Sequence, residues 1–230
     1  MDIASKRVFE VLQEKGVDTI YHANSVLTAC QFLRNRSLMS RGTVFRKGLY
    51  QTSQISDRID RKHGIWFDVF IDSVDIHDRA RQANCYGPVL FVINSELIKR
   101  AYTGKVWVTK LNPIYWRAKK YRERWFDSVK DLENNFVRGD FGQMIVFRHC
   151  GGELPFMKYL TEIILDDSEQ ETRGSRIDYY SMAYGALTLA ITEGGLNVRI
   201  KKRRCPNGCK CLDDYRINLD RTREMFIPRI

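Results

Sequence analysis

Residues 18–33 read DTIYHANSVLTACQFL, and this stretch changes from a strand-like to a helix-like pattern within a few positions. Its first part reads as a short strand that ends at His22. Asn24 follows, and asparagine is a favoured helix N-cap residue. Four residues then recur at helical spacing, Val26, Ala29, Cys30 and Leu33. The stretch therefore predicts a strand that leads directly into a helix of about three turns.

The apolar pattern predicts further elements along the chain. Helices are expected over residues 4–15, 125–136 and 179–191, and strands over 65–71, 88–93, 105–109, 143–147, 161–165 and 197–200. Residues 41–64 are polar and glycine-containing, which favours a long loop. The order of elements lacks regular strand–helix alternation, and neither a Gly-x-Gly-x-x-Gly fingerprint nor a P-loop is present. We expect an α+β fold with a mixed sheet.

Length and composition are those of an ordinary globular protein. The chain has 230 residues, of which 43% are hydrophobic, and no apolar run approaches the roughly 20 residues that span a bilayer. The first residues lack the apolar core of a secretory signal, so we expect a cytosolic protein with no membrane partner. We expect one domain over residues 1–200 and a basic, cysteine-containing tail over 201–230 that packs on it.

The formal net charge of +10 favours a polyanionic partner. Two clusters of basic residues are candidate nucleic-acid contacts: Arg117, Lys119 and Lys120 in the first, and Lys201, Lys202, Arg203 and Arg204 in the second. Aromatic residues at positions 115, 116, 121 and 125 surround the first cluster, and such rings can stack on unpaired bases. An amphipathic helix with a solvated basic face would produce the same pattern, and this alternative stays open.

Three of the six cysteines form a cluster, Cys205, Cys209 and Cys211. Three thiolates can begin a zinc site, with a distant fourth ligand such as His149 or Cys150. The spacing differs from that of standard zinc ribbons, and a Pro-Asn-Gly turn carrying ordinary reduced thiols is the simpler interpretation.

Three segments stand out when the chain is read in order. Residues 20–25 read IYHANS, residues 66–88 read WFDVFIDSVDIHDRARQANCYGP, and residues 142–165 contain GQMIV and then LPFMKYLTEIIL. An arginine-bearing loop with Arg58 and Arg61 precedes the second segment. In this order the segments resemble the DarT-like ADP-ribosyltransferases, toxins that modify nucleic-acid bases. The resemblance covers about residues 18–166.

The resemblance implies a fold, a reaction and partners. The fold would be the ADP-ribosyltransferase-like mixed, split β-sheet with flanking helices. The reaction would transfer ADP-ribose from NAD⁺, as co-substrate and without a required metal, to a base in single-stranded RNA or DNA. Such enzymes act in toxin–antitoxin systems and phage defence, which implies a protein antitoxin as a further partner.

The resemblance also assigns roles to residues. Tyr21, His22 and Asn24 would bind the nicotinamide riboside, and Tyr86 would stack on the nicotinamide ring. Arg58 and Arg61 would pair with the pyrophosphate, because charge-assisted contacts to phosphate are strong.

The family's catalytic glutamate would fall at Gln143. A glutamine there is nearly isosteric but cannot take a proton, and losing such a group typically costs about 10²- to 10³-fold in rate. Three explanations are open: a substitution that silences a toxin, a natural pseudoenzyme, or a different register in which Glu153 or another carboxylate acts. We favour the first, which makes this chain an inactivated form.

Two other functions compete. A metal-dependent nuclease could use the hard ligands between Asp68 and Asp78, which suit Mg²⁺ or Mn²⁺. A non-catalytic basic module could bind RNA or DNA through residues 115–125 and 201–210 without any use of NAD⁺.

Overall fold

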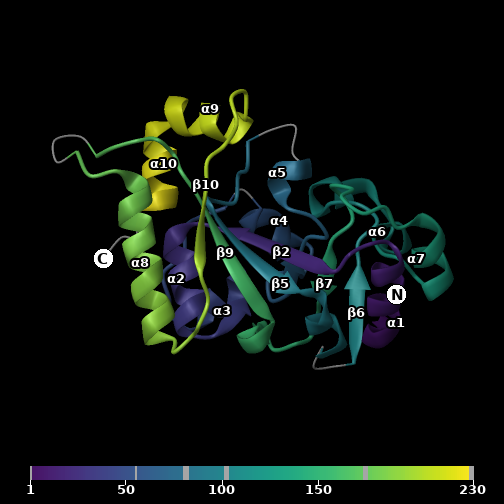
Figure 1. Ribbon diagram of the computed structural model, residues 1–230. Coiled ribbons are helices and arrows are strands. Elements are labelled where there is room, and N and C mark those ends of the chain that lie inside the picture. Colours follow the sequence, from purple (N-terminus) through teal and green to yellow (C-terminus); the bar gives the residue numbers. More distant parts are fainter. Residues whose placement is uncertain (1, 55, 80–82, 101–103, 173–175, 228–230) are drawn as a thin grey trace.

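A computed structural model describes residues 2–54, 56–79, 83–100, 104–172 and 176–227. In this part of the chain the strands form two four-stranded sheets and one two-stranded sheet, with helices around them (Figure 1). The expected α+β class is therefore confirmed, and one of the larger sheets is mixed.

The first sheet has the strand order β10-β9-β5-β2. Its strands are β2 (Thr19–Asn24), β5 (Val89–Asn94), β9 (Leu160–Asp166) and β10 (Ile200–Arg203). β5 pairs antiparallel with both β2 and β9, whereas β10 pairs parallel with β9. β5 is a continuous apolar run in the centre of this sheet, as its sequence predicts for a strand buried on both faces.

The second sheet is antiparallel and has the order β1-β6-β7-β4. It consists of β1 (Ile3–Ala4), β4 (Val69–Ile71), β6 (Lys105–Val108) and β7 (Ile145–Phe147). The two sheets meet where the backbone of Tyr21 in β2 pairs with that of Asp72, the residue after β4. The N–H of Tyr21 donates to the Asp72 carbonyl at 2.9 Å, and the N–H of Asp72 donates back at 2.8 Å.

Helices cover both ends of this arrangement. α2 (Val26–Arg34) packs against α8 (Tyr179–Glu193) beside the first sheet, and α9 (Lys210–Ile217) and α10 (Leu219–Phe226) lie near them (Figure 1). α1 (Ser5–Glu14) and α7 (Val129–Asn135) pack together at the other end. Tyr215 and Phe226 of the tail helices are fully buried in the same core as the first sheet.

The remaining elements are short. They are β3 (Ser37–Met39), which pairs with β8 (Glu153–Pro155), the helices α3 (Arg41–Arg46), α4 (Asp57–Lys62), α5 (Ile76–Arg79) and α6 (Tyr121–Arg124), and the 3₁₀ helices η1 (Ser95–Arg100), η2 (Pro113–Ala118) and η3 (Met157–Tyr159). No helix among the described residues is both long and apolar enough to cross a membrane.

Several boundaries differ from the sequence predictions. The predicted strand 65–71 is regular only over β4, and the predicted helix 125–136 begins at Val129. The expected loop 41–64 contains α3 and α4. The N-cap of α2 is Ser25, whose hydroxyl accepts from the Thr28 N–H, whereas the carbonyl oxygen of the Asn24 side chain accepts from the Ser25 N–H.

Candidate active site

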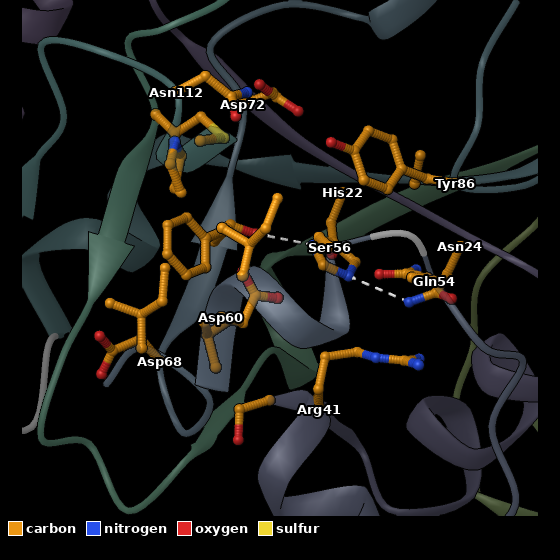
Figure 2. Close-up of a pocket in the computed structure, with 18 of the residues that line it drawn as sticks. His22, Asn24, Arg41, Gln54, Ser56, Asp60, Asp68, Asp72, Tyr86 and Asn112 are labelled. Carbon is orange, nitrogen blue, oxygen red and sulfur yellow. Dashed lines mark hydrogen bonds between the residues drawn. The ribbon is translucent and has the colours of Figure 1, made fainter. Parts of the chain in front are cut away.

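A pocket opens where β2 ends and the two sheets meet. Its walls come from β2, β4, the turn before α3, α4, the loop before β5, and the start of η2 (Figure 2). The lining residues are His22, Ala23, Asn24, Met39, Ser40, Arg41, Gln54, Ser56, Ile59, Asp60, Ile65, Asp68, Val69, Phe70, Asp72, Tyr86, Asn112, Pro113, Ile114 and Met144. An apolar wall with a few convergent polar groups is typical of a small-molecule site.

His22 and Asn24, two of the predicted binding residues, both line this pocket. The Nδ1 atom of His22 lies 2.8 Å from the carbonyl oxygen of Phe70, so Nδ1 carries the proton and donates it (Figure 2). Its Nε2 atom lies 3.4 Å from the Asn24 side-chain nitrogen, which donates to it weakly. Burial lowers the pKa of His22, which keeps the imidazole neutral. The result is a neutral ring with its acceptor nitrogen beside a side-chain amide.

Tyr86 also lines the pocket, at the end of a loop that is fixed against β2. The Asn84 side chain accepts from the Tyr86 N–H at 2.9 Å and donates to the Gly87 carbonyl at 2.8 Å. Gly87 has φ of +139°, and a Cβ atom there would lie 2.4 Å from the Asn24 backbone. Only glycine allows this approach, which holds Tyr86 close to the β2–α2 junction.

Tyr21, by contrast, contributes through its backbone. It joins the two sheets at Asp72, and its partly buried side chain is outside the set of pocket-lining residues. Burial raises the pKa of its phenol, with the Asp75 carboxylate adding to the shift.

Arg41 is a pocket residue that the sequence analysis missed. Its guanidinium forms a two-point ion pair with Asp57, with Nε–Oδ1 and Nη2–Oδ2 distances of 2.8 and 2.7 Å. The third nitrogen, Nη1, is buried and has no hydrogen-bond partner among the described residues. A buried donor without a partner is costly, so an anionic ligand at this position would be favoured. Ser40, the N-cap of α3, was the available sequence signal for a helix start here.

Arg58 and Arg61, the predicted phosphate ligands, lie outside the set of pocket-lining residues. Both are exposed on α4, and the Arg61 guanidinium stacks on the Trp66 ring at 4.3 Å. The sequence placed them in a loop, but in the helix their side chains leave on the solvent side. Ile59 and Asp60 are the α4 residues that line the pocket.

Three carboxylates line the pocket, and their environments differ. Asp68 pairs with Arg148, with an Nε–Oδ2 distance of 2.7 Å. Asp72 lies at the junction of the two sheets. Asp60 has no ion pair with the described residues, and burial raises its pKa to about 7. A carboxyl group with a pKa near neutrality can take or give a proton at physiological pH.

Gln143 lies apart from these groups. Its side-chain oxygen accepts from the Val137 N–H at 2.7 Å, and its nitrogen donates to the Asn135 carbonyl at 3.3 Å. The neighbouring Met144 lines the pocket, but Gln143 does not. The Gln143 amide thus holds the end of α7 through one accepted and one donated hydrogen bond. Glutamine can make both bonds, whereas an ionised glutamate cannot donate. The catalytic role of Gln143 stays a prediction, and its contacts offer a structural role as the alternative.

Glu153, the alternative carboxylate, lies on β8 and pairs with Lys47 at 2.8 Å. It stands opposite Met39 in the β3–β8 pair, one residue before the pocket-lining Ser40. Glu153 therefore lies near the pocket but outside the set of residues that line it.

The two basic clusters have different relations to the pocket. Arg117, Lys119 and Lys120 are exposed and follow Asn112, Pro113 and Ile114, which line the pocket. Lys201, Lys202 and Arg204 are exposed on or next to β10, at the edge of the first sheet opposite β2. Arg203 is committed to ion pairs with Asp75 and Asp166.

The four aromatic residues around the first cluster differ in how exposed they are. Trp116 and Trp125 are buried in a small core and cannot reach a base, whereas Tyr115 and Tyr121 are 59% and 45% exposed. Two of the four rings are thus available for stacking beside the pocket.

The acidic run from Asp68 to Asp78 does not assemble into a site for a hard cation. Asp68 pairs with Arg148, Asp75 with Arg203, and His77 with Asp166. The group with metal-ligand spacing among the described residues is instead His77, Cys205 and Cys209. The acidic run therefore gives no support to the interpretation as a metal-dependent nuclease.

No protein-family model matches this sequence, and no curated protein matches it. Among solved structures, the chain is similar to DarT from Thermus sp. 2.9, determined in complex with ADP-ribosylated single-stranded DNA. The two chains share 11% identity, the match covers 82% of this chain and 95% of that one, and the TM-score is 0.46.

Proposed function

We propose that the pocket binds NAD⁺ and that this protein transfers ADP-ribose to a base in single-stranded nucleic acid. The observation that carries the proposal is the pairing of two groups in one pocket. The first is the neutral His22–Asn24 pair at a strand end, and the second is the unpartnered Nη1 atom of Arg41. One group suits a sugar hydroxyl and the other suits a phosphate, which are the two recurring polar features of a dinucleotide.

The ribose would lie against His22 and Asn24. The Nε2 atom of His22 can accept from a ribose hydroxyl, because its 3.4 Å contact with Asn24 is long and readily replaced. The Asn24 amide can then donate to the same hydroxyl. Tyr86 and Phe70 line the same pocket and offer aromatic faces to the flat, cationic nicotinamide ring.

The pyrophosphate would meet Arg41. Asp57 holds the guanidinium plane from one side through its two-point contact, which leaves the Nη1 edge for the ligand. An arginine that is already oriented loses little conformational freedom when the phosphate binds. On this proposal Arg41 takes the role that the sequence gave to Arg58 and Arg61.

Asp60 is the proposed proton acceptor. The glycosidic bond between the ribose carbon and the nicotinamide nitrogen breaks, and its electron pair leaves with nicotinamide, which becomes neutral. A nitrogen or oxygen of the acceptor base bonds to the same carbon and gives its proton to the Asp60 carboxylate. The negative charge of that carboxylate would also stabilise the positive charge that develops on the ribose. This step needs no metal ion.

The acceptor strand would cross the surface next to η2. Exposed Tyr115 and Tyr121 can stack on unpaired bases, and Arg117, Lys119 and Lys120 can hold phosphates beside the pocket mouth. The basic run on β10 is separated from β2 by two strands, so the first cluster is the proposed contact.

The sheet arrangement supports the proposed family. On this proposal the two sheets joined by the Tyr21–Asp72 bridge would be the halves of the split sheet that the resemblance implies. A toxin role, a protein antitoxin, a part in phage defence and a cytoplasmic site of action are parts of the same proposal.

The first experiment measures NAD⁺ binding by titration calorimetry. His22→Ala and Arg41→Lys should each weaken NAD⁺ binding by at least tenfold, since each removes an oriented polar contact of about 1.5–3 kcal/mol. Arg61→Lys is the matched control, because Arg61 is exposed and stacks on Trp66. Equal NAD⁺ affinity in all four proteins, each folded by circular dichroism, would remove the pocket assignment.

The second experiment incubates the protein with labelled NAD⁺ and either single-stranded DNA or single-stranded RNA. Label should pass to one of the polymers in the wild type and not in Asp60→Asn, and the labelled polymer names the substrate. Cutting of nucleic acid with Mg²⁺ and without NAD⁺ would favour a nuclease. Nucleic-acid binding without NAD⁺ affinity would favour a non-catalytic module.

A further inference from the structure

A cluster of histidine and cysteine side chains lies apart from the pocket, between α5 and the C-terminal tail. The Nδ1 atom of His77 lies 4.0 Å from the Cys205 sulfur and 3.9 Å from the Cys209 sulfur. We propose that His77, Cys205, Cys209 and Cys211 bind one zinc ion.

The distances favour a shared metal ion over a hydrogen bond. The proton on one ring nitrogen cannot point at two sulfur atoms, yet His77 Nδ1 is almost equally far from both. A tetrahedral zinc ion with Zn–N near 2.0–2.1 Å and Zn–S near 2.3 Å sets its ligand atoms roughly 3.6 Å apart. The ligand atoms of His77, Cys205 and Cys209 lie within 4.8 Å of one another, so a small inward shift would bring these three to such spacings.

The far side of the His77 ring has the partner expected of a metal ligand. Its Nε2 atom donates to the Asp166 carboxylate at 3.0 Å, and Asp166 is fully buried. Asp166 is itself held by the Tyr215 hydroxyl at 2.7 Å and by Arg203 at 2.6 Å. Zinc-binding histidines commonly donate their second N–H to a carboxylate, which fixes the tautomer and aims the other nitrogen at the metal. Here that other nitrogen faces the sulfurs.

Cys209 and Cys211 lie at the N-terminus of α9. The turn from Cys205 to Cys209 closes through the Cys209 N–H, which donates to the Pro206 carbonyl at 3.1 Å. This turn brings two sulfurs to one side of the chain.

Cys211 is the proposed fourth ligand. It lies outside the group of three, but it follows Cys209 by two residues in the first turn of α9, it is buried, and its sulfur accepts from the Asn84 N–H at 3.1 Å. Backbone N–H donors to sulfur stabilise a thiolate. Three thiolates and one imidazole make a set of soft and borderline ligands that suits zinc, and four protein ligands make a closed, structural site.

The position of the site indicates what the ion would do. His77 lies in α5, between Asp72 and Tyr86, and both of these residues line the pocket. The thiols belong to the C-terminal tail. Zinc would fasten the pocket-bearing segment to the tail helices, which is independent of what the pocket binds.

The test measures zinc in the full chain, expressed with added zinc and dialysed against metal-free buffer. Elemental analysis should find one zinc per wild-type chain, one in Cys85→Ser and far less in Cys209→Ser. Cys85 is the control because it is exposed and outside the cluster. Replacing zinc with Co²⁺ should give thiolate-to-cobalt charge-transfer absorption and the intense visible bands of a tetrahedral ion.

Three results would overturn the proposal. One is a folded wild type that holds neither zinc nor Co²⁺. Another is a zinc content that Cys209→Ser leaves unchanged. The last is a denatured thiol count two below the six cysteines, which would indicate a disulfide in place of the metal. If Cys209→Ser does not fold, the wild-type zinc content and cobalt spectrum still decide.

Discussion

Gln143→Glu separates the two roles that this residue could have. If position 143 is catalytic, restoring the carboxylate should raise the transfer rate by about 10²- to 10³-fold. The contacts of Gln143 predict instead that the change destabilises the protein and gives no gain in transfer rate. The amide nitrogen that donates to the Asn135 carbonyl would become an oxygen that faces another oxygen. The contact with the Val137 N–H would remain.

The size of the loss follows from these two contacts. Gln143 is 9% exposed, so the Asn135 carbonyl would lose its donor in a place that water scarcely reaches. Leaving a buried acceptor unpaired costs about 1–3 kcal/mol, and the stronger bond from Val137 to a charged oxygen offsets part of it. For a chain of this length each kcal/mol lowers the melting temperature by about 2–4 °C, so a fall of roughly 2–12 °C is expected. Protonation would let the carboxyl donate again, so the deficit should shrink as pH falls.

The assay is thermal unfolding at several pH values, run beside the transfer assay with labelled NAD⁺. Gln170→Glu is the matched control, because its amide also donates to a carbonyl but in an exposed turn. That control should change the melting temperature little. A Gln143→Glu protein with an unchanged melting temperature and a large gain in transfer would refute the structural role and restore the catalytic one.

Three further changes test the pocket and its surroundings. Gly87→Ala adds a methyl group 2.4 Å from the backbone at the β2–α2 junction, at φ of +139°. This change should lower the free energy of unfolding by at least about 1–2 kcal/mol in denaturant titration and weaken NAD⁺ binding. Wild-type values for both quantities would contradict the close approach. Burial raises the pKa of Asp60 to about 7, so the transfer rate should increase as pH rises through about 7. Asp60→Asn should be inactive, yet above that pH it should be more stable than the wild type because no buried charge has to form. An inactive variant without that gain in stability would point to misfolding instead. The double change Lys119→Glu with Lys120→Glu should reduce the slope of log affinity against log salt concentration for single-strand binding by roughly 1.4. Lys201→Glu should leave this slope unchanged. A slope that changes in Lys201→Glu and not in the double variant would place the nucleic acid at β10.

The sequence predicted the longest and most periodic elements well. β5 and α8 were expected because a continuous apolar run and a helical repeat are local patterns, and both lie close to their predicted bounds. The strand-to-helix junction at His22 and Asn24 was also expected, and it does line the pocket. Such features depend only on residues that are neighbours in the chain.

The segment from residue 41 to residue 64 shows where a local reading fails. α3 and α4 are only 6 residues each, too short to produce an apolar stripe, and their polar composition was read as a loop. Arg41 and Asp60, the charged pocket residues of this segment, were missed for that reason. Arg58 and Arg61 are exposed on α4, and the sequence could not predict this because a loop gives no information on which way a side chain points.

The structural setting of Gln143 could not be predicted for a related reason. The sequence QMIVF predicts a strand over residues 143–147, but β7 begins at Ile145, and residue 143 lies between the preceding turn and this strand. A strand assignment would put alternate side chains on one face, whereas a turn residue is directed by its hydrogen bonds. The Asn135 and Val137 backbone groups that direct it come from the end of α7, which no local pattern could have indicated.

The proposed zinc site depends still more on contacts between distant parts of the chain. The sequence suggests His149 or Cys150 as a distant fourth ligand, yet the structure brings His77 to thiols 128 and 132 residues away. β10 pairs with β9 so that Arg203 stands opposite Asp166, and this register carries the cysteine turn to α5. Asn84 follows α5 in the chain. Its side chain accepts from the Tyr86 N–H, and its own N–H donates to the Cys211 sulfur. The proposed ligand His77 thus lies in the same chain segment as the pocket residues Asp72 and Tyr86, so zinc would link the tail to the geometry of the proposed NAD⁺ site.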